Sequence, residues 1–269
     1  MATSLYDHPL VTDECWEKYT EEEHRRWAFM FRRQQELLPN RAAPEVIEGM
    51  KKLNICEHMI PKFSDLNKVL LKTTGFSVVP VKSLIPEDLF FQLLSERKFP
   101  GTCFIRREDQ IDYLQEPDVF HEAFGHLPLL AHPVFADYME AFGRMGLEGI
   151  AKGLHKYVSA LYWFTVEFGL IQTAKGLRIY GAGITSSISE SIYSLESDIP
   201  TRVWFDPIRA MKTKYRIDDF QKTYFVIRNY DELFSLLKKI DWDEIKDQLL
   251  RGKDIEEGEI VSQSEIVKR

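Results

Sequence analysis

The chain has 269 residues, of which 44% are apolar and 29% charged, and its formal net charge is −7. This length suits one large domain, and the acidic balance gives no reason to expect nucleic acid or an anionic membrane as a partner. No apolar run reaches transmembrane length and the first residues lack a signal-peptide pattern, so we expect a cytoplasmic protein with no membrane partner.

The cysteines are few and scattered. Cys15, Cys56 and Cys103 show no CxxC spacing. An odd, dispersed set favours a reducing compartment and argues against both disulfides and a zinc–cysteine site.

In chain order, the sequence patterns predict mainly helices with a few short strands between them. A capping box at Thr20 begins the first helix, while Pro44, Ser64 and Pro86 begin the next three. The expected helices cover residues 20–37, 44–53, 64–74, 86 onward, 118–127, 157–171, 231–240 and 241–250, and the expected strands cover 76–81, 102–106, 177–180 and 224–227.

These strands are too short and scattered for a doubly wound sheet. We therefore predict an α+β, predominantly helical fold with a single domain over residues 1–250. The polar residues 251–269 are expected to form a flexible C-terminal tail.

Two histidines lie five residues apart in the predicted helix at 118–127. Pro117 suits the first helical position and Pro128 cannot continue the helix without losing a hydrogen bond, which places His121 and His126 near its two ends. A zinc-protease helix needs its histidines four residues apart, whereas a five-residue spacing on an α-helix separates them by about 140°. The two imidazoles can converge on one ion only if the short helix adapts.

Glu167 lies in an apolar stretch that reads as a buried helix. A buried carboxylate is costly unless it is paired or bound to a metal. Two histidines and one carboxylate form the set that holds a non-haem ferrous ion by one face and leaves other positions open for O₂. The alternatives are an internal Arg or Lys partner for Glu167, a zinc hydrolase with Glu122 as base, and a non-catalytic binding module.

Three stretches of the chain carry a family resemblance: residues 117–129, 162–170 and 180–187. In their order and spacing they resemble the pterin-dependent aromatic amino acid hydroxylases, and within that family the short bacterial-type phenylalanine hydroxylases. The resemblance covers roughly residues 10–240, which matches the family's catalytic domain. It implies hydroxylation of L-phenylalanine to L-tyrosine with O₂, a tetrahydropterin (tetrahydrobiopterin or a bacterial analogue) and Fe(II). Tryptophan or tyrosine as substrate stays open, because the shape of the pocket decides between them.

The resemblance also implies roles for individual residues. His121, His126 and Glu167 match the iron ligands, and Arg106 matches the arginine that binds the substrate carboxylate as a planar fork. No side chain outside the metal site is expected to act as a nucleophile. The residues matching the pterin site are Phe90, Ile85, Glu122 and Tyr162. The residues matching the substrate site are Arg106, Tyr113, Pro117, Trp163, Phe168 and Ser186.

Without the resemblance, several of these residues have plainer interpretations. Phe90 would be a core aromatic, and Glu122 a first-turn acid favoured by the helix dipole. Ser187 and Glu190 form a capping-box pattern. Because an oxidised pterin must be reduced again, the resemblance further implies pterin-recycling enzymes, a carbinolamine dehydratase and a pterin reductase, as functional partners.

Overall fold

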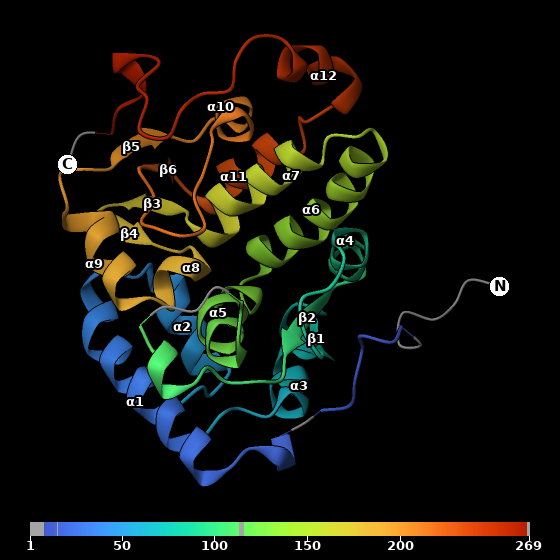
Figure 1. Cartoon of the computed structure of the whole chain (residues 1–269), viewed down its shortest axis with the longest axis vertical. Coiled ribbons are helices and arrows are strands. Elements are labelled where there is room, and N and C mark those ends of the chain that lie inside the picture. Colours follow the sequence, from blue (N-terminus) through green and yellow to red (C-terminus); the bar gives the residue numbers. More distant parts are fainter. Residues whose placement is uncertain (1–7, 15, 113–115, 268–269) are drawn as a thin grey trace.

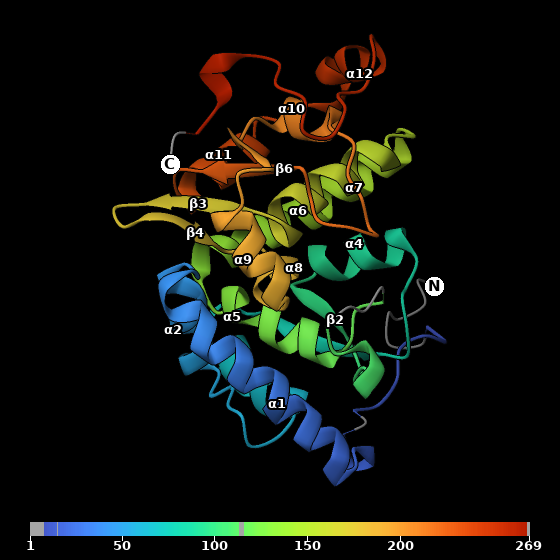
Figure 2. The same cartoon turned by 60° about the vertical axis from the view of Figure 1, so that its left-hand side comes forward.

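Helices dominate the computed structural model, which describes residues 8–14, 16–112 and 116–267 (Figures 1 and 2). The expected α+β, mainly helical fold is confirmed. No helix in these ranges is long and apolar enough to cross a membrane. The α-helices are α1 (Glu21–Leu37), α2 (Pro44–Lys52), α3 (Phe63–Thr73), α4 (Glu87–Ser95), α5 (Leu127–Leu130), α6 (Pro133–Ala151), α7 (His155–Tyr162), α8 (Ala182–Thr185), α9 (Ile188–Glu196), α10 (Pro207–Lys212), α11 (Tyr230–Leu237) and α12 (Trp242–Leu250). The 3₁₀ turns are η2 (Trp16–Lys18), η3 (Leu38–Asn40), η4 (Glu108–Gln110) and η7 (Gln263–Glu265).

The N-terminal helices begin close to where the sequence places them. The Thr20 hydroxyl accepts from the Glu23 N–H, and the Glu23 carboxylate accepts from the Thr20 N–H, so the capping box of α1 is formed. The start of α3 was predicted wrongly, because Lys62 rather than Ser64 is its N-cap. The Ser64 N–H instead donates to the Glu14 carboxylate.

A two-stranded parallel sheet joins β1 (Ser77–Val81) to β2 (Lys98–Thr102) through α4. The strand predicted at 102–106 is therefore wrong by several residues. Gly101 permits the observed pairing, since a Cβ there would lie 2.6 Å from the Val78 side chain. Residues 104–106 pair instead with the start of the histidine helix: the Val119 N–H donates to the Phe104 carbonyl at 2.8 Å.

A second sheet has the strand order β4 (Gly176–Ile179), β3 (Leu170–Thr173), β6 (Thr223–Ile227) and β5 (Thr201–Trp204). Only β3 and β4 are antiparallel. The sequence predicted β4 and β6 but not β3 or β5. The helix expected over 157–171 ends earlier than predicted, because Leu170 and Ile171 pair with β6.

One large cluster of buried side chains runs through the molecule from α1 to α12. Helices α6 and α7 run alongside each other through the middle of both views (Figures 1 and 2). The Gln34 side chain of α1 donates to the Thr185 carbonyl of α8, which links the first helix to the middle of the chain.

Two expectations about the chain's periphery differ from the structure. Residues 251–267 do not hang free: Ile255 bridges to Thr213, and Ile266 bridges to Val203 of β5. Apolar side chains explain this, since Val267 is buried in a cluster that sequence polarity alone did not reveal. In addition, Cys103 is disulfide-bonded while Cys56 is free, because scattered spacing does not decide which sulfurs meet after folding.

Candidate metal and substrate site

The two histidines lie on a π-helix, η5 (His121–His126), rather than on an α-helix. Its bonds run from residue i to i+5, as in the N–H of Leu127 donating to the Glu122 carbonyl. A π-turn holds more residues than an α-turn, so side chains five apart lie on nearly the same face. The π-helical geometry therefore allows both imidazoles to face one ion despite their five-residue spacing. It also lets the helix resume as α5 across Pro128, beyond the end expected at Leu127.

Glu167 ends a second π-helical segment, η6 (Trp163–Glu167), which continues α7. The Phe168 N–H closes it by donating to the Trp163 carbonyl at 2.8 Å. The turn before α8 packs directly on this segment, since a Cβ on Gly181 would lie 2.4 Å from the Glu167 carbonyl oxygen. Only a glycine fits there, and the close approach fixes the end of η6. Both segments with proposed ligands are thus π-helical, a form often found at functional sites.

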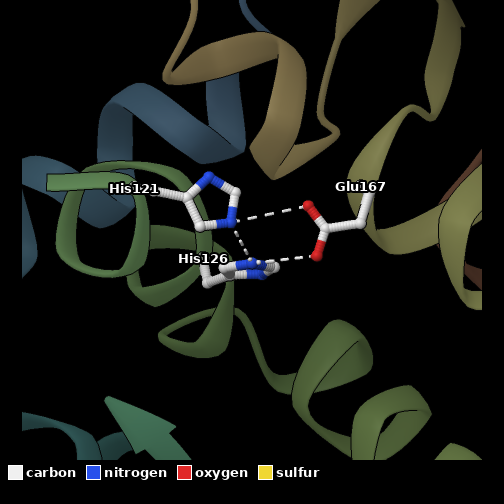
Figure 3. Close-up of side chains that lie close together, drawn as sticks. All are labelled: His121, His126 and Glu167. Carbon is white, nitrogen blue, oxygen red and sulfur yellow. Dashed lines mark hydrogen bonds and ion pairs between the residues drawn. The ribbon is translucent and has the colours of Figure 1, made fainter. Parts of the chain in front are cut away.

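The three predicted ligands face one another across these segments (Figure 3). The two Nε2 atoms of His121 and His126 are 3.0 Å apart. One Glu167 oxygen lies 3.6 Å from His121 Nε2, and the other lies 3.2 Å from His126 Nε2. Two nitrogen ligands bound at right angles to one ion at about 2.1 Å would themselves lie about 3 Å apart. The donor types and their spacing therefore fit one metal ion held on one face.

The electrostatic setting keeps His121 and Glu167 in the forms that bind metal. Burial lowers the pKa of His121 to about 4, so its imidazole is neutral at pH 7. Burial alone would raise the pKa of Glu167, but the nearby His126 and His121 and the Gly183 N–H lower it overall. A neutral imidazole and an ionised carboxylate are the ligand forms required.

Ser186 fixes the tautomer of His121. Its hydroxyl donates to the Ala182 carbonyl at 2.8 Å and lies 2.9 Å from His121 Nδ1. Because its one proton is used on Ala182, Ser186 must accept from the Nδ1–H, which leaves the Nε2 lone pair facing Glu167. The structure thus places this predicted substrate residue against the metal ligand.

Arg106 uses one side of its guanidinium on Asp118. Its Nε and one terminal nitrogen donate to the two Asp118 oxygens at 2.9 and 2.8 Å, and its other terminal nitrogen donates to the Ile111 carbonyl at 3.2 Å. Burial opposes ionisation of Asp118, but the bonds and charge of Arg106 lower its pKa overall. Of the five N–H groups of an arginine, these contacts use three. The remaining two have no hydrogen-bond partner among the described residues and can bind a carboxylate.

Asp118 was not singled out from the sequence. It is fully buried, and besides pairing with Arg106 it accepts from the His121 N–H at 3.0 Å. It therefore caps the histidine helix and holds the arginine beside it. Its position three residues before His121 was the available signal, since aspartate is a common N-cap.

Three of the predicted pterin residues, Phe90, Tyr162 and Glu122, lie near one another. The Phe90 ring of α4 meets the Tyr162 ring edge-on, with centroids 5.3 Å apart. Burial raises the pKa of Tyr162, and the negative charges of Glu167 and Glu122 raise it further. Burial also raises the pKa of Glu122 well above its usual value. Ile85 lies apart from this group and packs on the small cluster formed by Val79, Leu89 and Leu93.

Two of the predicted substrate residues, Trp163 and Phe168, form an aromatic wall next to Glu167 in the chain. The rings of Trp163 and Phe168 have centroids 4.6 Å apart. Tyr215, which sequence reasoning missed, stacks on Trp163 at 4.7 Å. The Pro117 carbonyl accepts from the Thr102 hydroxyl, which ties it to the end of β2. Tyr113 lies outside the described residues.

Comparisons with known proteins agree on a family. Residues 14–249 match the family described as biopterin-dependent aromatic amino acid hydroxylase. The chain is 53% identical over 219 residues to the phenylalanine-4-hydroxylase of Chromobacterium violaceum, covering 81% of this chain and 74% of that protein. It is 45% identical over 257 residues to the phenylalanine-4-hydroxylase of Caulobacter vibrioides, covering 96% and 87%. The crystal structure of the C. violaceum enzyme with bound oxidised Fe(III) matches with a TM-score of 0.93 and 47% identity over 96% of this chain and 94% of that chain.

Proposed function

The chain belongs to the biopterin-dependent aromatic amino acid hydroxylases and is a pterin- and iron-dependent monooxygenase, and we propose that it hydroxylates L-phenylalanine to L-tyrosine with O₂ and a tetrahydropterin. The observation that carries the proposal is the convergence of His121, His126 and Glu167 on two π-helical segments. Phenylalanine is favoured over other aromatic amino acids because the similar proteins named above are phenylalanine hydroxylases.

In this proposal the three ligands hold Fe(II), which together with the tetrahydropterin supplies the O₂ chemistry. The rest of the work is positioning by this chain's own side chains. Ser186 holds His121 in the tautomer that offers Nε2, and Asp118 holds both the His121 backbone and Arg106. The two free N–H groups of Arg106 bind the substrate carboxylate.

The aromatic residues place the two organic partners. Phe90 would stack on the pterin ring, with Tyr162 and Glu122 near it and Ile85 contributing from the neighbouring cluster. Trp163, Phe168 and Pro117 would enclose the substrate ring. The apolar wall excludes water, which strengthens the polar contacts of Arg106.

The deciding experiment is anaerobic reconstitution of the purified protein with Fe(II), followed by O₂, tetrahydropterin and phenylalanine, tyrosine or tryptophan in separate reactions. We expect tyrosine from phenylalanine, with a higher kcat/KM than for the other two amino acids. Preference for tryptophan would overturn the substrate but keep the family chemistry. Hydrolysis without O₂ by the zinc-loaded protein would favour a hydrolase with Glu122 as base.

The proposal includes a cytoplasmic location. It also includes dependence on pterin-recycling enzymes, since the oxidised pterin must be reduced before it is used again. With limiting pterin, tyrosine formation should stop near one product per pterin. Adding a carbinolamine dehydratase, a pterin reductase and its reductant should allow many turnovers per pterin. An unchanged yield would remove this part of the proposal.

A further inference from the structure

The indole of Trp163 is held on three sides. Its ring lies between those of Phe168 and Tyr215, with centroids 4.6 and 4.7 Å away. Its N–H donates to the Gln221 side-chain oxygen at 3.0 Å. Stacking restrains the tilt of the ring, and a directed hydrogen bond additionally fixes where its N–H edge points. Gln221 therefore sets the rotation of Trp163.

The Gln221 amide has only one workable orientation. Its nitrogen lies 2.7 Å from the Arg216 carbonyl and 3.4 Å from the Asp219 carbonyl. Carbonyl oxygens only accept, so the NH₂ group must face them and the amide oxygen must face the indole. Gln221 is only 3% exposed, which keeps water from competing for these bonds. The Gln221 amide oxygen is therefore held in a fixed position where it accepts the hydrogen bond of the Trp163 N–H.

The Glu190 side chain anchors the backbone of Gln221. The Gln221 backbone N–H and the Tyr224 hydroxyl both donate to the same Glu190 oxygen. The sequence suggested that Glu190 would close a capping box with Ser187, but only half of the box forms. Ser187 accepts from the Glu190 N–H, while its own N–H donates to the Ile184 carbonyl. The Glu190 carboxylate is therefore free to face residues 221–224.

A ring contact fixes the same loop to α9. Phe220 stacks on Tyr193, with centroids 4.5 Å apart and planes 15° from parallel. Glu190 and Tyr193 both belong to α9, so this helix holds the loop at two successive residues, 220 and 221. Because the loop carries Gln221, α9 indirectly restrains the position of Trp163. Trp163 lies four residues before Glu167 on η6.

We propose that Gln221 is a positioning residue for the aromatic substrate, and that Glu190 and Tyr224 hold it in place so that the Trp163 ring keeps one fixed orientation beside the substrate ring. This rests on the proposed function, in which Trp163 walls the ring pocket. Loss of the acceptor leaves the indole N–H without a partner in a partly buried place, so the ring turns to reach water. A small displacement of such a wall misaligns the substrate with the metal face.

The test is a double-mutant cycle between Gln221→Leu and Trp163→Phe, with phenylalanine binding to the iron-loaded protein measured by calorimetry without O₂ or pterin. Gln221→Leu should weaken phenylalanine binding about three- to tenfold, the usual worth of one hydrogen bond. In the Trp163→Phe background, which has no indole N–H, the same substitution should change binding little. Gln172→Leu, a partly buried glutamine on β3, is the matched control and should have no effect.

Two further readouts separate positioning from damage to the fold. The indole N–H resonance of Trp163, assigned by its loss in Trp163→Phe, should shift in Gln221→Leu while iron content stays unchanged. The fraction of oxidised pterin that yields tyrosine should also fall. Equal weakening of binding in both backgrounds would overturn the proposal, as would a shifted indole signal with unchanged binding.

If Gln221→Leu does not fold, Tyr224→Phe replaces it, because it removes one hydroxyl and hardly any volume. It should weaken phenylalanine binding less, about two- to threefold, and again only when Trp163 is present. An effect that is the same in the Trp163→Phe background would refute the role of the network. Failure of the wild type to bind phenylalanine would instead overturn the proposed function, while the indole resonance still reports the Gln221 bond.

Discussion

The metal face and the aromatic wall are built in different ways, although both include residues of η6. The metal face depends on two short stretches of backbone, where π-turns bring His121 and His126 to one side and end at Glu167. The wall depends on side chains from distant parts of the chain: Trp163 and Phe168 at η6, and Tyr215 and Gln221 from the loop before β6. The metal face is thus fixed locally, whereas the wall can be adjusted from several directions.

The largest expected effect comes from removing a ligand of the metal face. His126→Ala should lose most of the bound iron and all hydroxylation, because the remaining His121 and Glu167 offer only two donors. Iron content and tyrosine formation measure this, and His155→Ala, which changes an exposed histidine, is the control. Full activity in an iron-free His126→Ala protein would contradict the assignment of His126 as a metal ligand. It would then leave no metal face to set apart from the aromatic wall.

Arg106 is joined to the metal face through Asp118, which also accepts from the His121 N–H, and Arg106→Lys should have the next largest effect. Lysine keeps the charge but cannot form a fork with Asp118 and the substrate carboxylate together. We expect KM for phenylalanine to rise about ten- to a hundredfold, equivalent to about 1.5–3 kcal/mol. Steady-state kinetics test this against Arg107→Lys, whose arginine is exposed and pairs with Asp109. Unchanged kinetics would mean that the carboxylate binds elsewhere.

Glu190 anchors the loop that carries Gln221, but its burial lowers the stability of the folded protein at high pH. Burial raises its pKa to about 7 from an ordinary value of 4.5, so the folded state favours the protonated acid. Its contribution is fully present below about pH 4.5 and is lost as the pH rises through 7. Between pH 5 and 8 the loss is about 2.5 kcal/mol, since one pKa unit corresponds to about 1.4 kcal/mol.

Glu190→Gln removes this titration. The variant should therefore become more stable relative to the wild type as the pH rises from 5 to 8, as seen in Tm by calorimetry. Glu148→Gln, at an exposed glutamate, should show no such trend. A constant difference in Tm across the pH range would rule out Glu190 as the titrating group.

The smallest expected effect concerns Phe90 in the group of predicted pterin residues. Phe90→Ala removes a stacking contact worth about 0.5–1.5 kcal/mol beyond burial. The pterin KM should rise about tenfold or less, or more pterin should be oxidised without tyrosine formation. Phe29→Ala, which changes an exposed phenylalanine of α1, is the control. If pterin kinetics and coupling stay unchanged, Phe90 is only a core aromatic.

The comparison also shows what the sequence could predict. The ligands were identifiable because His121, His126 and Glu167 are rare residue types in an apolar setting. Their convergence was not, since α-helical geometry sets the two histidines apart and the π-turn appears only in the folded backbone. Most helices were predictable from caps and prolines, while β3 and β5 were missed because each is short and defined only by pairing with β6.

The wall was harder to predict for a physical reason. Gln221 acts on Trp163 from 58 residues away, and no local pattern records that bond. Glu190 was misleading, because a capping-box sequence suggested a local role that the folded chain only half fulfils. Contacts of this kind depend on how α9 and the loop before β6 come together.

The π-turn at His121–His126 has a consequence for insertions and deletions. An α-helix advances by about 100° per residue, so one residue more or less between the histidines changes the phase of everything after it. Deleting Ala123 would give a spacing of four, which an ordinary α-helix can place on one side. The same deletion would rotate the buried leucines of α5 relative to the core. Length between the two histidines is therefore under a double constraint, and a one-residue deletion should be far more harmful here than a substitution that keeps the count.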